Sequence, residues 1–282
     1  MNNILVTGAT GNVGKEVVKW LDKNQLPHTL ALENEKMQEI FSTKNSVIFN
    51  FYDESTWENS IKNIDSVFLL RPPVISDVKK YIFPFLALCL SKNIKRIVFL
   101  SLQGVQFNIF TPHHKIEKYL LKNKADYTII RPNFFMQNLS TIYASDIKEN
   151  NEIFLPAGKG KTAFIDVSDI GEAVANSFAS STHIKKAYTL SGSESLDYWQ
   201  VASKLSAVLG RQITYKNPST KEYIKRLKEK GYAEDYIKVQ KMLYFVVRHN
   251  FSASTASDAQ AILGHDPILF DDFAKNNKNV WQ

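Results

Sequence analysis

Hydrophobic positions along the chain fall into two alternating kinds of segment. Short apolar runs, typical of buried strands, occur at 3–7, 28–33, 46–51, 65–70, 95–101 and 126–131. Amphipathic segments of helix length occupy 13–23, 35–43, 55–63, 76–92 and 113–123, with a kink expected at Pro84. Continuous apolar runs such as Val67–Leu70 indicate strands covered on both faces. The alternation predicts an α/β fold, a doubly wound parallel sheet with helices on both faces.

A glycine-rich turn follows the first predicted strand, with the spacing G-x-x-G-x-x-G. Glycines let the backbone turn sharply and bring amide groups close to a pyrophosphate at a helix N-terminus, where the helix dipole also favours negative charge. The turn follows a strand and opens a helix, which favours a phosphate-binding turn over a plain strand–turn–helix joint. The expected contacts with the pyrophosphate come from Thr7, Gly8, Thr10, Gly11, Asn12, Val13 and Gly14.

The rhythm changes after Arg131 and Pro132. Further helices are predicted at 137–149, 196–209, 219–230 and 233–248, with a return of strand and helix at about 162–190. We therefore expect a Rossmann-type nucleotide-binding domain at 1–132, joined by the return at 162–190. The rest of 133–282 is expected to form a smaller, mostly helical substrate lobe interleaved with the first domain. Ligands of open α/β sheets bind at the carboxyl ends of the strands, so we expect the site in the cleft between the lobes.

The end of the second strand bears on the choice between NAD and NADP. Glu33 lies about 20–25 residues beyond the glycines, where an acidic side chain accepts ribose hydroxyl protons and repels a 2′-phosphate. This position favours NAD. In the alternative interpretation Glu33 is only the solvated entry to a helix, and Lys36 meets a phosphate.

The remaining strand ends supply further candidate contacts. Asn50 and Phe51 are expected where an adenine would lie, and Ser101 beside the nicotinamide position. Arg71 is expected either to add charge near the pyrophosphate or to be a surface arginine. The cofactor contacts predicted after the fourth strand are Leu70, Arg71 and Pro72.

Composition limits the classes of function. The 282 residues carry a formal net charge of +7, with 44% hydrophobic residues, enough for a full core. The densest lysine cluster, at 221–230, is interrupted by Glu222 and Glu229, which indicates a solvated helix face and argues against direct binding of nucleic acid. The six histidines form no metal-ligand pattern.

Other features of the sequence concern compartment. No apolar run approaches the ~20 residues of a membrane span. The start lacks the basic and apolar regions of a signal peptide, so we expect a cytoplasmic protein. The single cysteine, Cys89, lies in an apolar run, which excludes an internal disulfide and favours a buried thiol over a nucleophile.

Four stretches together resemble the NmrA-like branch of the atypical short-chain dehydrogenases: 6–14, 68–73, 127–138 and 164–170. Within that branch the chain is similar to reductases of the ergot-alkaloid, triphenylmethane and quinone type. The resemblance implies a Rossmann domain with a small substrate lobe and NAD(P) between them. It also implies that Phe134, Phe135, Met136 and Asn138 face the nicotinamide side, Phe134 touching cofactor and substrate. For Phe134 and Met136 a simple core role is the alternative.

One position departs from the wider family. Short-chain dehydrogenases usually carry Tyr-x-x-x-Lys on the helix after the fifth strand. Aligning Glu117 and the helix at 115–123 with the family puts Ile109 at the tyrosine position and His113 at the lysine position. Ile109 cannot transfer a proton. His113 is expected to hydrogen-bond the ribose, to act as an acid near neutral pH, or simply to open a helix after Pro112.

The function predicted from these residues is reduction of a hydrophobic, electron-poor small molecule (quinone, iminium or dye-like) by hydride transfer from NAD(P)H, with His113 and Ser101 as candidate catalytic residues. Such a reaction can draw its proton from water, and aromatic side chains can stack the substrate. The stacking candidates are Phe134, Phe135, Tyr143 and Trp199, the last with a core role as alternative. The competing hypothesis is a dinucleotide-sensing regulator without turnover. We expect a monomer or homodimer without a metal.

Overall fold

The computed structural model describes residues 3–94, 96–256 and 258–282. The predicted strand at 95–101 is therefore described only from Arg96 onward. The chain divides into two compact units. Unit 1 comprises residues 3–132, Val167–Leu190 and Asp258–His265, and unit 2 comprises Asn133–Asp166, 191–256 and Asp266–Gln282.

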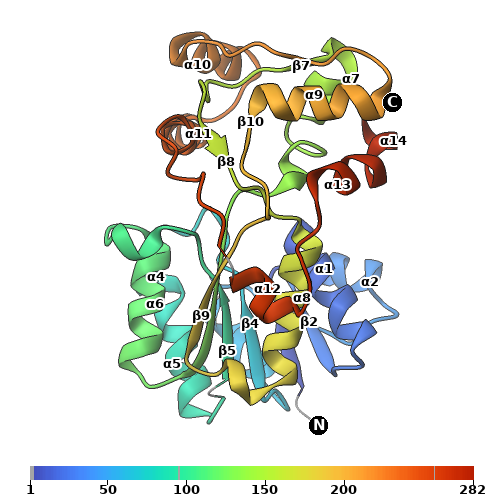
Figure 1. Cartoon of the computed structure of the whole chain (residues 1–282). Coiled ribbons are helices and arrows are strands. Elements are labelled where there is room, and N and C mark those ends of the chain that lie inside the picture. Colours follow the sequence, from blue (N-terminus) through green and yellow to red (C-terminus); the bar gives the residue numbers. More distant parts are fainter. Residues whose placement is uncertain (1–2, 95, 257) are drawn as a thin grey trace. The chain divides into compact units, whose positions relative to one another are not determined.

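Unit 1 is built on a seven-stranded sheet in the order β3-β2-β1-β4-β5-β6-β9 (Figure 1). All its neighbouring strands run parallel, so the carboxyl ends of the strands meet at one edge. The predicted parallel α/β sheet of the Rossmann type is confirmed. The strands are β1 Ile4–Val6, β2 His28–Leu32, β3 Ser46–Ile48, β4 Ser66–Leu69, β5 Arg96–Leu100, β6 Asp126–Pro132 and β9 Lys186–Leu190.

Helices cover both faces of this sheet (Figure 1). On one face, Leu5, Val67 and Ile97 share an apolar core with residues of α5 and α6. On the other side α1 packs closely along α8. The helices of unit 1 are α1 Asn12–Lys23, α2 Glu35–Ile40, α3 Trp57–Ser60, α4 Val78–Tyr81, α5 Phe83–Ser91, α6 Pro112–Lys122, α8 Val167–Ala179 and α12 Asp258–Leu263, with short 3₁₀ turns at Glu54–Thr56, Val105–Phe107 and Ser181–His183.

The helix predicted at 76–92 forms as two helices, α4 and α5, separated at Ile82. Pro84 lies in the first turn of α5, where the missing N–H removes no helical hydrogen bond. The proline thus produces a break between two helices where a kink within one was expected.

Unit 2 is mostly helical and has its own core, in which Trp281, Tyr198 and Phe270 are among the largest fully buried side chains. The helix predicted at 137–149 begins only at Ala144, because a 3₁₀ turn and a further turn occupy the residues before it. Two pairs of two-residue strands, β8 with β10 and β7 with β11, were not predicted. The elements are 3₁₀ Met136–Asn138, α7 Ala144–Asn150, β7 Glu152–Ile153, β8 Lys161–Thr162, β10 Leu196–Asp197, α9 Tyr198–Leu209, β11 Thr214–Tyr215, α10 Thr220–Glu229, α11 Glu234–Arg248, α13 Phe270–Asn276 and α14 Lys278–Trp281.

Within the described residues, no helix combines the length and apolar character needed to cross a membrane. Nor do three or more His, Cys, Asp or Glu side chains of that part of the chain gather in a group that could hold a metal ion. Cys89 is buried, and burial raises the pKa of its thiol to about 12, so it packs as a small apolar side chain. In the lysine cluster at 221–230, Lys225 pairs with Glu229, as on a solvated helix face.

Candidate functional site

The glycine turn between β1 and α1 is shaped by two close approaches. Gly8 has a φ of +65°, and a Cβ there would lie 2.4 Å from the Leu70 side chain. A Cβ on Gly14 would lie 2.0 Å from the Gly8 carbonyl oxygen. Both positions therefore require glycine for the turn itself.

Gly11 differs from the other two glycines. Its φ is −78°, and an added Cβ would make only an ordinary contact, 3.5 Å from the Gly8 oxygen. Its amide donates to that same oxygen, and its carbonyl accepts the first helical bond, from Lys15. Nothing within the turn explains why this position is glycine. A ligand that must approach the bare backbone would explain it.

Thr7 holds the end of β1 against the end of β4. Its buried hydroxyl donates to the Phe68 carbonyl at 2.9 Å and accepts from the Leu70 amide at 2.8 Å. The side chain, predicted as a cofactor contact, thus fixes the start of the glycine turn to the end of β4. Leu70 packs on Gly8 from the other side.

The residues after β2 and β3 differ in their exposure. Glu33 is exposed directly after β2, and Asn34 caps α2 by accepting from the Met37 amide. The Asn50 side chain accepts from the Tyr52 amide within a turn. The ring of Phe51, expected beside an adenine, lies instead in the core, edge-on to Phe49.

Arg71 folds back onto its own loop. Its Nη1 donates to the carbonyls of Pro72 at 2.7 Å and Ile75 at 2.6 Å, and burial lowers the pKa of the guanidinium. The guanidinium, expected to meet either a pyrophosphate or solvent, instead fixes the loop that contains Pro72. Its Nε is buried without a hydrogen-bond partner among the described residues.

A second buried polar atom without a partner within the described chain is Oε1 of Gln103. Arg71 and Gln103 lie on loops that follow the neighbouring strands β4 and β5, and the Gln103 amide donates to the Pro132 carbonyl. Buried polar atoms are almost always hydrogen-bonded in folded proteins. By contrast, a donor on Arg71 and an acceptor on Gln103 lack partners in the described part of the chain at this edge of the sheet. Gln103 was not among the predicted site residues, although its place two residues after Ser101 is a usable signal.

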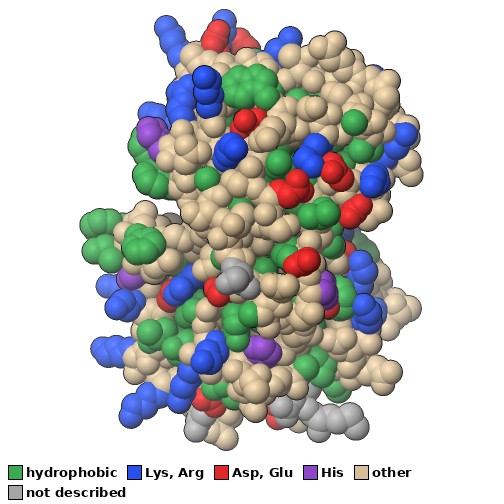
Figure 2. Space-filling model, in the orientation of Figure 1, with side chains coloured by type: hydrophobic (Ala, Val, Ile, Leu, Met, Phe, Trp, Pro, Cys, Tyr) green, Lys and Arg blue, Asp and Glu red, His purple; other side chains and the backbone are tan. Residues whose placement is uncertain are grey.

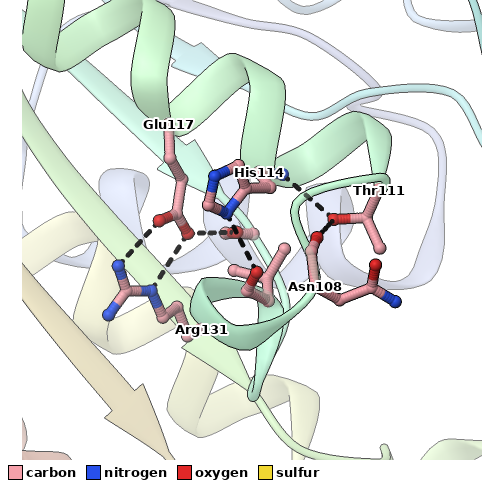
Figure 3. Close-up of polar contacts among 7 residues, drawn as sticks. Asn108, Thr111, His114, Glu117 and Arg131 are labelled. Atoms are coloured by element: carbon pink, nitrogen blue, oxygen red, sulfur yellow. Dashed lines mark hydrogen bonds and ion pairs between the residues drawn. The ribbon is translucent and has the colours of Figure 1, made fainter.

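Ser101, Glu117 and Arg131 form a buried network beside these loops. The Ser101 hydroxyl donates to Glu117 Oε1 at 2.5 Å. Arg131 donates to the same carboxylate twice, from Nε at 3.0 Å and from Nη2 at 2.7 Å, and Figure 3 shows the two side chains facing each other. The Ser101 hydroxyl therefore gives its proton to Glu117. Ser101, a candidate catalytic residue, is buried and uses its hydroxyl hydrogen in this bond, so its catalytic role stays a prediction.

His113 is in the first turn of α6, with its imidazole stacked on the Phe99 ring at 6.0 Å between centroids. Burial, and then the charge of Arg71, lower the pKa of His113 to about 3. The ring is neutral at pH 7, so the expected role as an acid near neutral pH is wrong. Ile109, assigned to the tyrosine position, lies in the loop before α6 and is exposed.

This pKa predicts a pH-dependent stability. Below its ordinary value of 6.5 the imidazole takes a proton in the unfolded chain but not in the folded one, down to about pH 3. Lowering the pH through this window therefore favours unfolding, by up to about 1.4 kcal/mol per pH unit. We expect urea unfolding at pH 7 and pH 5 to show a smaller pH dependence for His113→Asn than for the unmodified protein. Equal pH dependence would show that His113 is not held neutral.

The candidate substrate residues lie in unit 2. Met136 is buried in the core of unit 2, in the same apolar cluster as Phe164 and Phe270. Phe134 is half-buried against the core of unit 2, and Phe135 pairs with Ile165. Asn138 belongs to the 3₁₀ turn that follows.

The two other substrate candidates have different neighbours. The Tyr143 hydroxyl is buried and hydrogen-bonded to Tyr244, and burial raises its pKa, which describes a core residue. Trp199 is partly exposed and packs edge-on to Tyr215. The substrate roles predicted for these side chains stay predictions.

Comparison with known proteins extends over the whole chain. The NmrA-like family model matches residues 1–273. Prestalk A differentiation protein A of Dictyostelium discoideum is 29% identical, covering 97% of this chain and 91% of that protein. Festuclavine synthase I of Penicillium roqueforti is 27% identical, covering 99% of each.

Two solved structures share the fold. The triphenylmethane reductase of Citrobacter sp. complexed with NADP(H) superposes with a TM-score of 0.86 at 17% identity, covering 98% of this chain and 99% of that one. The NADPH-dependent quinone oxidoreductase of Escherichia coli complexed with NADPH has a TM-score of 0.86 at 20% identity, covering 97% and 99%. Since the family model extends over nearly the full length, this protein belongs to the NmrA-like family.

Proposed function

We propose that this chain is an NAD(P)H-dependent oxidoreductase that reduces a hydrophobic, electron-poor small molecule such as a quinone, an iminium compound or a dye. The observation that carries the proposal is the glycine turn, and above all Gly11, whose bare backbone the turn itself does not need. Two structures of the same fold are described as complexes with NADP(H) and NADPH, and both proteins are named as reductases or oxidoreductases of such compounds.

The described residues fit a dinucleotide. The amides at the start of α1 and the positive end of its dipole suit a pyrophosphate. The open donor on Arg71 Nε and the open acceptor on Gln103 Oε1 suit polar groups of the bound cofactor. A bound reduced nicotinamide would supply the hydride.

The protein's own contribution is then to position the reactants. Glu117 and Arg131 hold the Ser101 hydroxyl in one orientation, with its acceptor lone pairs left for a ligand. Neutral His113 can hydrogen-bond a ribose without adding charge. Holding donor and acceptor in contact contributes up to roughly 7–11 kcal/mol, and the product's proton can come from water. That substrate contacts come from unit 2, through Phe134, Phe135 and Met136, is part of the proposal.

The proposal is tested by measuring consumption of NADH and NADPH by the purified protein with a panel of quinones, iminium compounds and dyes. We expect consumption above the protein-free rate with at least one class of acceptor. Consumption at the background rate with every acceptor would overturn the assignment as a reductase.

A dinucleotide-sensing regulator is the second candidate. The structure of the site favours it in one respect: the Ser101 proton is committed to Glu117 and His113 is neutral, so neither is set up as a proton donor. The Dictyostelium relative is named for differentiation and not for a reaction. Calorimetry with each dinucleotide would show binding by both candidates, whereas only the reductase would consume the reduced cofactor in the presence of an acceptor.

We propose NAD as the preferred cofactor, because exposed Glu33 follows β2. A carboxylate there would accept from the ribose hydroxyls and repel a 2′-phosphate. Glu33→Arg is expected to shift the ratio of NADH to NADPH affinities toward NADPH by at least about tenfold, measured by calorimetry. Glu35→Arg, which changes the charge equally two residues further on, is the control. An unchanged ratio in Glu33→Arg would remove Glu33 from the ribose.

A further inference from the structure

The loop that joins β5 to α6, residues 102–111, is held in place by its own polar groups. The Phe107 amide donates to the Gly104 carbonyl at 3.1 Å, and Thr111 Oγ1 donates to the Asn108 carbonyl at 2.9 Å. His114 of α6 contacts the Val105 carbonyl through Nδ1 at 3.1 Å (Figure 3). Because these contacts satisfy the backbone from within, the loop has a defined conformation.

This loop exposes large apolar side chains to solvent, whereas an ordinary surface loop exposes mainly polar ones. Phe107 exposes 86% of its surface, Phe110 82% and Ile109 60%, whereas Val105 is buried as an anchor. Figure 2 shows hydrophobic side chains standing out at the left edge of the view, where Figure 1 shows the chain approaching α6. Contiguous exposed apolar side chains on an ordered surface mark a place of binding.

The position and charge of the loop indicate what it binds. It starts directly after Ser101 and ends at the helix turn that carries His113, so both its ends belong to the candidate site. Residues 102–111 include no charged side chain. Two exposed phenylalanines on a loop that has no charged residue of its own match an uncharged aromatic molecule better than a charged partner.

We propose that Phe107 and Phe110 are specificity-determining residues that pack against the aromatic body of the substrate, so that the protein selects acceptors with several fused rings. This inference rests on the proposed reductase function and deepens it. Each added ring of the substrate buries more apolar area against one or two phenylalanine rings, which makes the free energy of binding more favourable.

The test compares two uncharged quinones of different size, 1,4-benzoquinone with one ring and 9,10-phenanthrenequinone with three. The variant is Phe107→Ser/Phe110→Ser, and kcat/KM is measured at saturating cofactor. We expect a loss of at least about tenfold for the three-ring quinone and of less than about threefold for the one-ring quinone. Phe107→Leu/Phe110→Leu keeps apolar side chains at both positions. It should therefore retain most of the kcat/KM for the three-ring quinone that the serine variant loses. Ile40→Ser, which removes another exposed apolar side chain of unit 1, should change neither value.

Three outcomes would overturn the inference: equal losses for both quinones, no loss, or a dimer of the unmodified protein that the serine variant converts to a monomer. The last would mean that a second copy covers the loop. If the unmodified protein reduces no acceptor of the wider panel, the proposed function fails separately; if it reduces neither of these two quinones, the loop is tested by binding. Binding of phenanthrenequinone, followed by quenching of tryptophan fluorescence, then decides: weaker binding by the serine variant supports the loop assignment. Equal binding, or none by the unmodified protein, rejects it.

Discussion

Gly11→Val is expected to weaken binding of both NADH and NADPH by at least about a hundredfold while the protein stays folded. The turn itself has room for a side chain, because a Cβ would lie 3.5 Å from the nearest atom and the φ of −78° suits any L-residue. A branched side chain would, however, fill the space through which a pyrophosphate approaches the amides. The loss of affinity would therefore come from the ligand and not from the fold.

Calorimetry with each dinucleotide and thermal unfolding without cofactor check this expectation together. Gly14→Ala is the contrasting variant, since its Cβ would lie 2.0 Å from the Gly8 oxygen and must distort the turn. We expect Gly14→Ala to lower the melting temperature and Gly11→Val to leave it within a few degrees. Wild-type affinity in Gly11→Val would show that no pyrophosphate binds this turn.

Local sequence pattern predicted the sheet well because each strand is short, apolar and bounded by turns. The run at 65–70 became β4, and the glycine turn lies between β1 and α1 as predicted. The pattern was less informative where the structure depends on distant partners. The segment at 258–263 forms α12 against α8, and its Asp258 accepts from the Thr189 amide. Nothing in the sequence of this segment predicts that it contacts α8 or Thr189.

Site residues were hardest to predict where side-chain direction decides the role. Phe51 follows a strand end as a cofactor contact would, yet its ring turns into the core beside Phe85. Arg71 follows the next strand end, yet its Nη1 donates hydrogen bonds to carbonyls of its own loop. Residue type and spacing place a backbone at the edge of a sheet, whereas the direction of each side chain depends on packing.

Arg131→Met is expected to destabilise unit 1 by about 3 kcal/mol or more. Arg131 gives two hydrogen bonds to Glu117, a residue that is only 6% exposed. Removing the guanidinium leaves a buried charge with the Ser101 hydroxyl as its remaining partner in the network, and such breaks typically cost about 3–5 kcal/mol. Urea unfolding followed by circular dichroism measures the loss.

A double variant separates two contributions to the free energy of unfolding: the cost of leaving Glu117 charged without Arg131, and the stabilisation by the intact ion pair. Glu117→Leu/Arg131→Met removes both charges, so it should be more stable than Arg131→Met alone, although it lacks one more native side chain. Lys19→Met, which breaks the exposed pair with Glu16, is the matched control and should cost less than about 1 kcal/mol. If the double variant proves less stable than Arg131→Met, the network stabilises the protein through the hydrogen bond between Ser101 and Glu117 and not by charge compensation. Ser101, Glu117 and Arg131 would then act mainly to position the end of β5. In that case the double variant should also bind the cofactor more weakly than Arg131→Met does.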